Sequence, residues 1–320
     1  MAKVTDHIAE AKGKTIFSIE IIPPSKGSNS IDELLAGIEP MMELKPPFID
    51  VTYHREEYFI KQMPDGGQKE VRSRRRPGTV GICSAIMHKF DVDPVPHVLC
   101  GGFTKEDTED LLFDLNYLGI DNVMALRGDI AKPFNVFKPK KGGHAYASEL
   151  IAQIRNLNKG KYLYEDGEPD AFTNFCIGAA AYPEKHYEAQ DMEVDMLNLK
   201  KKIEAGADYI VTQMFFDNQK YFDFVNKCRA NGITIPIIPG LKVLATKKQL
   251  EILPELFYLD MPAELRNAVE KSKDNNEAKE IGIEWCVQQC KELKEFGVPA
   301  LHFYTMSKSA TTLAVAKQVF

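Results

Sequence analysis

Apolar and polar positions follow two different periods along this chain, and the two kinds of segment take turns from end to end. Short apolar runs typical of buried strands occupy residues 15–22, 48–53, 95–100, 122–127, 174–180, 208–214, 235–239 and 299–304. Stretches with the apolar spacing of amphipathic helices lie between many of them, at 31–44, 104–118, 145–157, 191–205, 218–231 and 277–296. This alternation predicts an α/β fold built as a parallel (β/α)8 TIM barrel.

A doubly wound open sheet is the competing architecture for such an alternation. It is disfavoured because no GxGxxG turn follows any of the strands, and because polar residues recur at the ends of many strands rather than at one switch point. We therefore expect a single barrel domain over residues 1–320.

The first predicted strand holds a carboxylate among apolar residues. Glu20 stands in the run FSIEII, and Pro23 and Pro24 end the strand because proline cannot donate ladder hydrogen bonds. Glu20 is thus placed near the C-terminal end of its strand, where barrel enzymes carry their chemistry. A buried carboxylate needs a partner, a raised pKa or a function. At this point a purely structural glutamate is an equally good interpretation.

Polar residues also gather at the ends of the other strands, and a barrel brings these ends to one mouth. They include the segments Asp50–His54, Arg127–Asp129, Tyr182–His186, Gln213–Asp217 and His302–Thr305. Gly128 allows close approach of a ligand to the backbone, and Asp129 adds a second carboxylate. Two carboxylates indicate acid–base chemistry or a glycosidase pair. No DxD or HExxH pattern indicates a metal.

The helix over 191–205 has a polar stripe beside its apolar stripe rather than opposite it. Asp195, Asn198 and Lys202 form the polar stripe, next to apolar positions such as Met196 and Leu199. From the residues alone this is either a salt-bridged surface helix, the more common case, or a helix edge that meets a ligand.

Composition and charge narrow the class of protein. The chain has 44% hydrophobic and 27% charged residues, a formal net charge of −6 and a pI near 5.7, which argues against non-specific nucleic-acid binding. A basic run at 55–78 is more typical of solvated surface or anion contact than of a nucleic-acid patch. No apolar run reaches membrane-span length and the N-terminus lacks a signal-peptide core, so we expect a cytoplasmic protein. The six cysteines are scattered and predict reduced, mostly buried thiols.

Several motifs occur in a fixed order that is highly specific as a set. They are FSIEIIPP, DVTYH, MALRGD, YAS, AAYPEKHYEA, the DMLNLKKKIEAGADYIVTQMFFD segment, IIPG, KDNNEA and HFYT. Together, from about Thr15 to about Thr312, they resemble the catalytic domain of the methylenetetrahydrofolate reductases, which are FAD-dependent (β/α)8 barrels. The chain is similar to the short bacterial form, which has no C-terminal regulatory domain.

The resemblance implies an activity. It predicts a ping-pong flavoprotein oxidoreductase of one-carbon metabolism and methionine biosynthesis, in which NADH or NADPH reduces FAD and departs. 5,10-Methylenetetrahydrofolate then takes its place and is reduced to 5-methyltetrahydrofolate. The residues do not distinguish NADH from NADPH. Members of the family are commonly homo-oligomers, so a homo-oligomer is expected here.

The resemblance also implies roles for particular residues. Glu20 would be the general acid that protonates the folate, and Asp129 would lie beside flavin and pterin. Gln213 would contact both pterin and nicotinamide, Thr52 would contact nicotinamide, and Lys308 stands where an arginine commonly supports the folate. The residues that match FAD contacts are Thr52, Tyr53, His97, Arg127, Gly128, Asp129, Tyr146, Ala147, Tyr182, His186, Asp195, Asn198, Lys201 and Lys202.

Two other functions are consistent with these residues. One is a non-catalytic flavin- or folate-binding subunit of a larger complex, because Lys308 replaces the usual arginine and Leu253 stands where some bacterial members have an aromatic residue. The other is an unrelated barrel lyase or glycosidase that uses Glu20 and Asp129. The residues that match FAD contacts favour the reductase over both.

Overall fold

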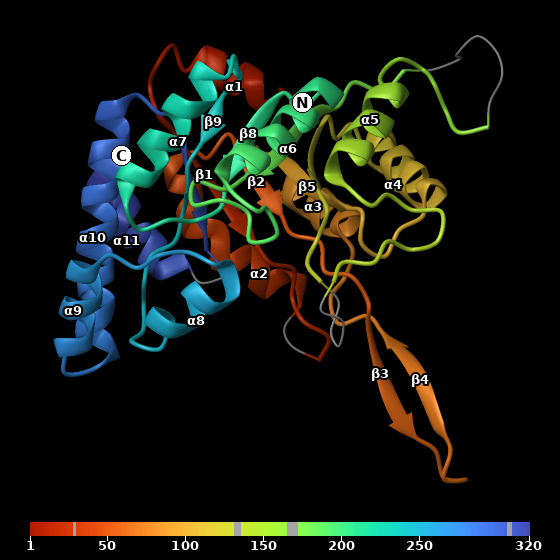
Figure 1. Ribbon diagram of the computed structural model, residues 1–320, viewed down its shortest axis with the longest axis horizontal. Coiled ribbons are helices and arrows are strands. Elements are labelled where there is room, and N and C mark those ends of the chain that lie inside the picture. The colour runs from red at the N-terminus through yellow and green to blue at the C-terminus, as the bar shows by residue number, and fades with distance from the viewer. Residues whose placement is uncertain (28–29, 131–135, 165–171, 306–308) are drawn as a thin grey trace.

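The computed structural model describes residues 1–27, 30–130, 136–164, 172–305 and 309–320, and its centre is a closed parallel barrel (Figure 1). The barrel strands are β1 (Ile16–Ile21), β2 (Phe48–Val51), β5 (Asp93–Leu99), β6 (Asn122–Leu126), β7 (Cys176–Ala181), β8 (Tyr209–Thr212), β9 (Ile237–Ile238), β10 (Gly240–Leu241) and β11 (Ala300–Tyr304). Each predicted apolar run overlaps a barrel strand.

The closure of the barrel follows from the strand order, which is β10-β11-β1-β2-β5-β6-β7-β8-β9. The two ends of this order, β9 and β10, are consecutive in the chain and separated only by Pro239, so they are two halves of one barrel strand. Proline has no N–H to give to a ladder, which explains the interruption. The Pro239 carbonyl instead accepts a hydrogen bond of 3.1 Å from the His302 N–H of β11. The predicted TIM barrel is confirmed.

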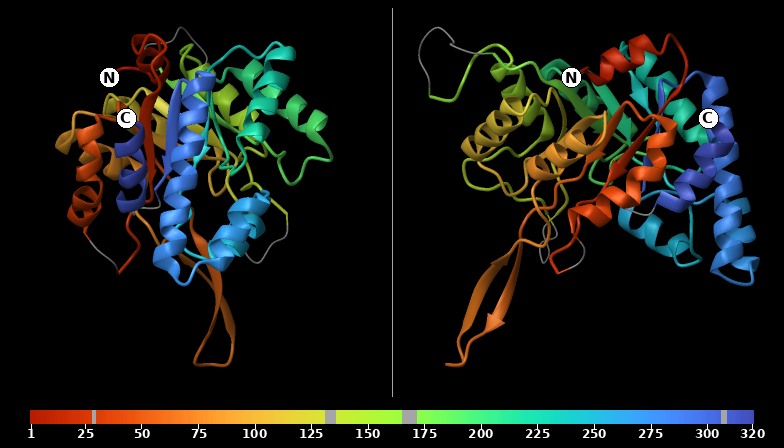
Figure 2. Two further views of the ribbon diagram at one scale, coloured as in Figure 1. Left: turned by 90° about the vertical axis from the view of Figure 1, so that its left-hand side faces the viewer. Right: turned by 180° about the vertical axis from the view of Figure 1, so that it is seen from behind.

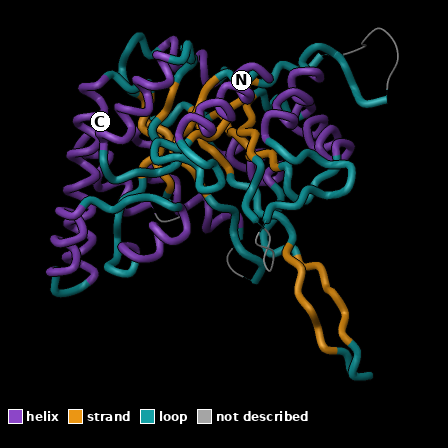
Figure 3. The backbone as a smooth tube through the Cα atoms, viewed as in Figure 1, coloured by secondary structure: helices purple, strands orange, loops and turns teal. Residues whose placement is uncertain are grey.

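Helices surround the strands on the outside (Figure 3). They are α2 (Ile31–Ile38) with the 3-10 helix η1 (Glu39–Leu44), α3 (Thr79–Lys89), α4 (Lys105–Tyr117), α5 (Ala147–Leu157), α6 (Met192–Ala205), α7 (Asn218–Ala230), α8 (Gln249–Phe257), α9 (Ala263–Lys271), α10 (Asn275–Phe296) and α11 (Ser309–Val319). The six helical stretches predicted from apolar spacing are confirmed. The spacing did not predict α3, whose apolar side chains surround much of its circumference, or the short helices α8 and α9.

Along each strand, side chains point alternately toward the surrounding helices and toward the barrel axis. Ile19 and Ile21 of β1 belong to the core between strands and helices, whereas Ser18 and Glu20, in the opposite phase, face the barrel axis. The lower interior is apolar and is filled by Phe48, Val95, Met124, Tyr209, Ala300 and their neighbours. Ser18 and Glu20 lie above this apolar layer, near the C-terminal strand ends.

The helix α1 (Val4–Glu10) covers the N-terminal end of the barrel, although the apolar spacing predicted no element there. Val4 is fully buried, and its N–H donates a 2.9 Å hydrogen bond to Oδ1 of Asn122 on β6. His7 Nε2 lies 2.6 Å from Asp93 Oδ2 on β5. These contacts close the end of the barrel that is opposite the predicted site.

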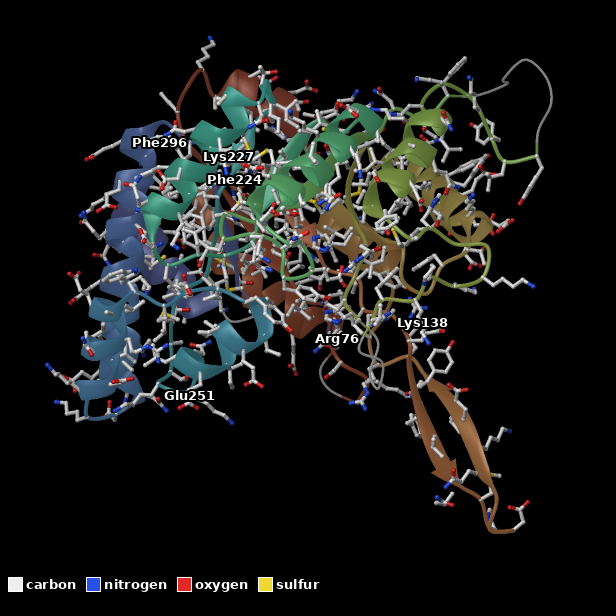
Figure 4. All side chains as sticks on the ribbon, viewed as in Figure 1. Arg76, Lys138, Phe224, Lys227, Glu251 and Phe296 are labelled. Atoms are coloured by element: carbon white, nitrogen blue, oxygen red, sulfur yellow. The ribbon has the colours of Figure 1, made fainter. Side chains whose placement is uncertain are left out.

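A two-stranded antiparallel hairpin, β3 (Glu57–Gln62) and β4 (Gln68–Ser73), projects away from the barrel in all three views of Figures 1 and 2. We call residues 57–73 the arm. It pairs with no barrel strand. It leaves the barrel after β2, on the side of the C-terminal strand ends, and Arg76 lies at its base (Figure 4). The basic run at 55–78 was expected at the surface, but its hairpin was not predicted.

Two polar loops connect β6 to α5 and α5 to β7. The segment 136–146 contains no helix or strand, and residues 131–135 and 165–171 lie outside the described residues. All six cysteines are buried free thiols, as expected. Among the described helices, none is both long and apolar enough to span a membrane.

Candidate active site

Glu20, Asp50 and His97 meet at the centre of the barrel mouth. They come from the adjacent strands β1, β2 and β5, and Glu20 and Asp50 are direct register partners. Nε2 of His97 lies 3.5 Å from Oε2 of Glu20 and 3.4 Å from Oδ2 of Asp50. The exposed side-chain fractions are 17% for Glu20, 8% for His97 and 1% for Asp50. Two carboxylates thus share one imidazole in a nearly water-free site.

Burial controls the protonation of this triad. It raises the pKa of Glu20 to about 7; the charges of His97 and Lys242 oppose this rise, and that of Asp50 adds to it. Burial also acts to lower the pKa of His97, but the carboxylates of Asp50 and Glu20 close to its Nε2 outweigh it, so this pKa is raised. Oδ1 of Asp50 has no hydrogen-bond partner among the described residues. The site therefore favours a cationic His97 beside a readily protonated Glu20.

A second buried polar pair lies one step deeper on the same side of the barrel. Oγ of Ser18 and Nδ1 of His302 are 2.9 Å apart, and both side chains are fully buried. Burial lowers the pKa of His302, so its ring is neutral near pH 7. The hydroxyl of Tyr304 donates to the Thr212 carbonyl at 2.7 Å, while Nζ of Lys242 donates to the Tyr304 carbonyl at 2.9 Å. These bonds fix β11 beside Glu20.

A group of cationic and aromatic side chains lies at the ends of β6 and β7 and along α6. The rings of Tyr182 and His186 are 4.6 Å apart, and Nζ of Lys202 lies 5.8 Å from the Tyr182 ring centre. The His186 N–H donates to Asp195 Oδ2 at 2.9 Å. Arg127 Nη1 lies 2.5 Å from a carboxylate oxygen of Glu188, and burial, Arg127 and Lys202 all act to lower the pKa of His186. We call Arg127, Tyr182, His186, Asp195 and Lys202 the cation–aromatic group.

Lys202 is the most informative member of this group. Its ammonium donates to the Ala180 carbonyl at 2.8 Å, and this is its one hydrogen bond among the described residues. An ammonium has three donors, so two remain for a ligand. Burial lowers its pKa to about 8, against the charge of Asp195 and together with that of Arg127. A partly desolvated cation of this kind is suited to an anionic group such as phosphate.

Gly128 and Asp129 follow Arg127 at the mouth. Gly128 has φ +85°, and a Cβ there would lie 3.3 Å from Cδ1 of Leu99, so a side chain would be strained. The charge of Asp129 acts on the pKa values of Tyr182 and Arg55, which places its carboxylate within electrostatic range of both. The second predicted carboxylate thus lies beside the cation–aromatic group, while no described contact joins it to Glu20.

The remaining predicted residues are distributed around the mouth. Oγ1 of Thr52 lies 3.1 Å from Nε2 of His54, and the ring of Tyr53 packs edge-on against Phe103 at 5.1 Å. Oε1 of Gln213 accepts the Met214 N–H at 2.9 Å. Among the described residues, no hydrogen bond, ion pair or ring contact joins four other predicted positions to the cation–aromatic group: Tyr146, Ala147, Asn198 and Lys201. Lys308 lies outside the described residues.

Sequence reasoning missed two acidic residues of the mouth. Asp50 was quoted in a motif but given no role, although it repeats the signal of Glu20: a carboxylate in an apolar strand. Glu184 accepts the Asp260 N–H at 2.8 Å, and its Oε1 lacks a partner among the described residues. Burial raises the pKa of Glu184 to about 7. It lines a pocket with Tyr182, Gln213 and other residues.

The base of the arm forms a basic cavity at the rim of the mouth. It has a volume of about 360 Å³ and is lined by Pro24, Ser25, Lys26, Gly27, Arg74, Arg75, Arg76 and Pro77. The Arg76 guanidinium donates to the Pro23 carbonyl, and the Lys26 N–H donates to the Arg75 carbonyl at 2.5 Å. Since the lining contains four cationic residues and no carboxylate, anion contact is the better interpretation of the basic run.

The fold and this mouth define a class: a (β/α)8-barrel protein with an acid–histidine centre beside a cationic, aromatic ligand site. No cluster of three or more histidine, cysteine or acidic side chains in the described residues could hold a metal. The methylenetetrahydrofolate reductase family model matches residues 3–319, and the chain therefore belongs to that family.

Comparison with curated relatives agrees with this assignment. The chain is 31% identical to methylenetetrahydrofolate reductase (NADH) 1 of Arabidopsis thaliana, over 98% of this chain and 50% of the plant protein. It is 29% identical to 5,10-methylenetetrahydrofolate reductase of Escherichia coli, over 98% of this chain and 93% of that protein. The chain thus spans about half the length of the plant relatives. An uncharacterised Clostridium thermocellum protein that binds two copies of 5-methyl-5,6,7,8-tetrahydrofolic acid shares the fold, with TM-score 0.65 and 16% identity over 99% of this chain and 98% of that one.

Proposed function

We propose that this chain is a flavin-dependent reductase that converts 5,10-methylenetetrahydrofolate to 5-methyltetrahydrofolate in cytoplasmic one-carbon metabolism, supplying methyl groups for methionine biosynthesis. NADH or NADPH is the electron donor, and the two substrates use the site in turn. Family membership supports the reaction. The single observation that carries the chemistry is the buried Glu20 carboxyl, held 3.5 Å from His97 and with its pKa raised to about 7.

The cation–aromatic group fits a flavin dinucleotide. The ammonium of Lys202, which has unused donors, and the guanidinium of Arg127 can both bind a pyrophosphate. The carboxylate of Asp195 can accept a hydrogen bond from a ribose hydroxyl. Gly128 permits backbone approach to the ligand. By resemblance, the site is completed by Thr52, Tyr53, His97, Asp129, Tyr146, Ala147, Tyr182, His186, Asn198 and Lys201. Bound there, FAD supplies the hydride acceptor and donor of the reaction.

Glu20 is the proton donor in this proposal. Its carboxyl gives a proton to the folate amine as the five-membered ring of the substrate opens, which leaves an electrophilic iminium on the folate. With a pKa of about 7, Glu20 is still substantially protonated at neutral pH, whereas an ordinary glutamate would be ionised. The cationic His97 then stabilises the carboxylate that remains, and Asp50 holds His97 in its charged form.

Other residues at the mouth position the substrates. Asp129, Gln213 and Lys308 hold the folate, and Thr52 and Gln213 contact the nicotinamide during the first half-reaction. Folate ends in carboxylates, and the basic cavity lined by Lys26 and Arg74–Arg76 supplies cations at the rim for an anionic group.

The purified full chain tests this proposal directly. We expect a yellow protein with a flavin spectrum that oxidises NADH or NADPH when 5,10-methylenetetrahydrofolate is present, and we expect comparison of the two nicotinamides to give the preferred donor. A protein that binds neither FAD nor folate would contradict the proposal. A protein that binds both without turnover would instead support the non-catalytic subunit.

A further inference from the structure

The arm exposes apolar side chains on a sheet that contacts no barrel strand. Tyr58, Phe59 and Ile60 are exposed to 49%, 46% and 65%. An isolated two-stranded hairpin is marginally stable in water unless another surface packs against it. Figures 1 and 2 show the arm standing clear of the barrel in every view. Exposed apolar residues on such an element are typical of a protein–protein contact.

One face of the arm combines apolar groups with like charges. Phe59 pairs with Val71 across the hairpin, and Lys61 pairs with Lys69. Two ammonium groups directly opposite each other are destabilising, at roughly 5 Å between their Cβ atoms. Among the described residues, no carboxylate is in ion-pair contact with either lysine. We call Phe59, Lys61, Lys69 and Val71 the lysine face; it favours an acidic partner with exposed aromatic groups.

Helix α4 carries a surface with the complementary character. Asp110, Phe113, Asp114 and Tyr117 have i, i+3, i+4, i+7 spacing and form one exposed stripe, in which Phe113 is exposed to 40% and Tyr117 to 83%. The two aromatic rings are 6.0 Å apart. Neither aspartate forms an ion pair with a cation among the described residues. We call these four residues the acidic stripe.

The two surfaces also match in spacing. Aspartates one helical turn apart have Cβ atoms roughly 5–6 Å apart, close to the roughly 5 Å that separates two cross-strand lysines. The arm, residues 57–73, contains three lysines and arginines and three acids, so its formal net charge is zero and the rest of the chain carries the net charge of −6. The attraction therefore comes from Lys61 and Lys69 on one face of the arm and not from the net charge of the arm. Every copy of the chain thus carries both the lysine face and the acidic, aromatic stripe that complements it.

We propose that the lysine face of the arm docks on the acidic stripe of a second copy of this chain, and that two copies exchange arms reciprocally to form a closed dimer. Each copy gives one arm and receives one, so the two contacts are equivalent and no binding surface is left open. The docking covers Phe59, Phe113 and Tyr117 and gives Lys61 and Lys69 two carboxylates.

Charge reversal tests both surfaces. Sedimentation velocity of the full chain should show a dimer that dissociates more readily at high salt. We expect K61E/K69E to raise the dimer Kd by at least about 100-fold, because like charges would then face each other, and D110K/D114K to do the same. Q62E/Q68E, which adds the same charges on the opposite face of the arm, should leave the dimer intact. Far-ultraviolet circular dichroism checks that each variant is folded.

Mixing the two reversed variants is the decisive step. A heterodimer of K61E/K69E with D110K/D114K has one contact with both charges reversed and one contact of native sign, so both contacts attract. Two proteins that are monomeric alone should therefore form a dimer together. A monomeric wild-type chain, a mixture that stays monomeric, or a Q62E/Q68E variant that dissociates as readily as K61E/K69E would overturn the proposal.

Discussion

Asp50 and Ile60 are ten positions apart in the chain, yet the carboxylate is 1% exposed and the isoleucine is 65% exposed. The first lies at the barrel mouth, and the second lies on the arm. Burial of a charge is costly unless the charge is paired, and exposure of an apolar side chain forfeits its transfer free energy. Pairing with His97 offsets part of the cost of burying Asp50, whereas the exposed Ile60 side chain contributes little to the stability of its own chain.

The difference between the two regions indicates two kinds of function. At the mouth, desolvation and nearby charges change the proton affinity of Glu20 and His97, as is common at catalytic sites. On the arm, Tyr58, Phe59 and Ile60 expose apolar surface, which is typical of a surface that binds a partner.

The largest effect is expected for Glu20→Gln. Loss of the general acid should slow folate reduction about 10²–10⁴-fold and leave reduction of the flavin by NADH or NADPH nearly unchanged. Stopped-flow measurement of the two half-reactions separates these steps. Glu10→Gln, at the closed end of the barrel, is the control. If folate turnover survived in Glu20→Gln, another group would be the acid.

A pair of matched truncations should separate the barrel from the arm. Ile49 is fully buried between β2 and the helices, so Ile49→Ala should lower the free energy of unfolding by about 2–5 kcal/mol. Ile60→Ala, on the arm and off the lysine face, should change it by less than about 0.5 kcal/mol. Urea denaturation of both variants measures the difference. Equal losses of unfolding free energy would show that Ile60 is packed against the barrel of the same chain and is not exposed on the arm.

Glu20 should also make stability depend on pH. Burial raises its pKa to about 7 in the folded state, so the folded state binds this proton more tightly than the unfolded state does. Its contribution to stability is fully present below about pH 4.5 and is lost as the pH rises through about 7. Relative to Glu20→Gln, the wild type should therefore lose roughly 3 kcal/mol between pH 4.5 and 8. Parallel pH curves for the two proteins would contradict this assignment.

A smaller effect is expected for His97→Gln. The charge of His97 lowers the pKa of Glu20, so its removal should raise that pKa further, by about one unit. The alkaline limb of the pH profile for folate reduction should move upward by the same amount, measured in single turnovers with bound flavin. His144→Gln, whose ring bonds to Gln153 on α5, is the matched histidine control. A downward shift in His97→Gln would mean that His97 is neutral.

Much of the site could be predicted because strand ends are local features. Glu20 was placed correctly at the end of β1 by its apolar neighbours and by Pro23 and Pro24. Asp50 was given no role, although it stands in an equally apolar strand. Its importance comes from the 3.4 Å contact with His97, and the chain positions of these two residues do not indicate that contact.

The arm illustrates the opposite case. Its sequence is polar with short apolar runs, so no periodic stripe marked it as a hairpin. A hairpin is stabilised by cross-strand pairs such as Phe59 with Val71, and by whatever surface covers it. The spacing of apolar residues along a single strand shows neither the cross-strand pairs nor the surface that covers the hairpin.

The sequence by itself determined the barrel, its strand positions and the polar character of the strand ends, because each depends on which side of a local element is apolar. Only the tertiary structure decided that Glu20, Asp50 and His97 share one water-poor site, and that the arm stands apart from the barrel. Proton affinity depends on desolvation and on charges within a few ångströms. Those distances are set by packing between segments that lie far apart in the chain.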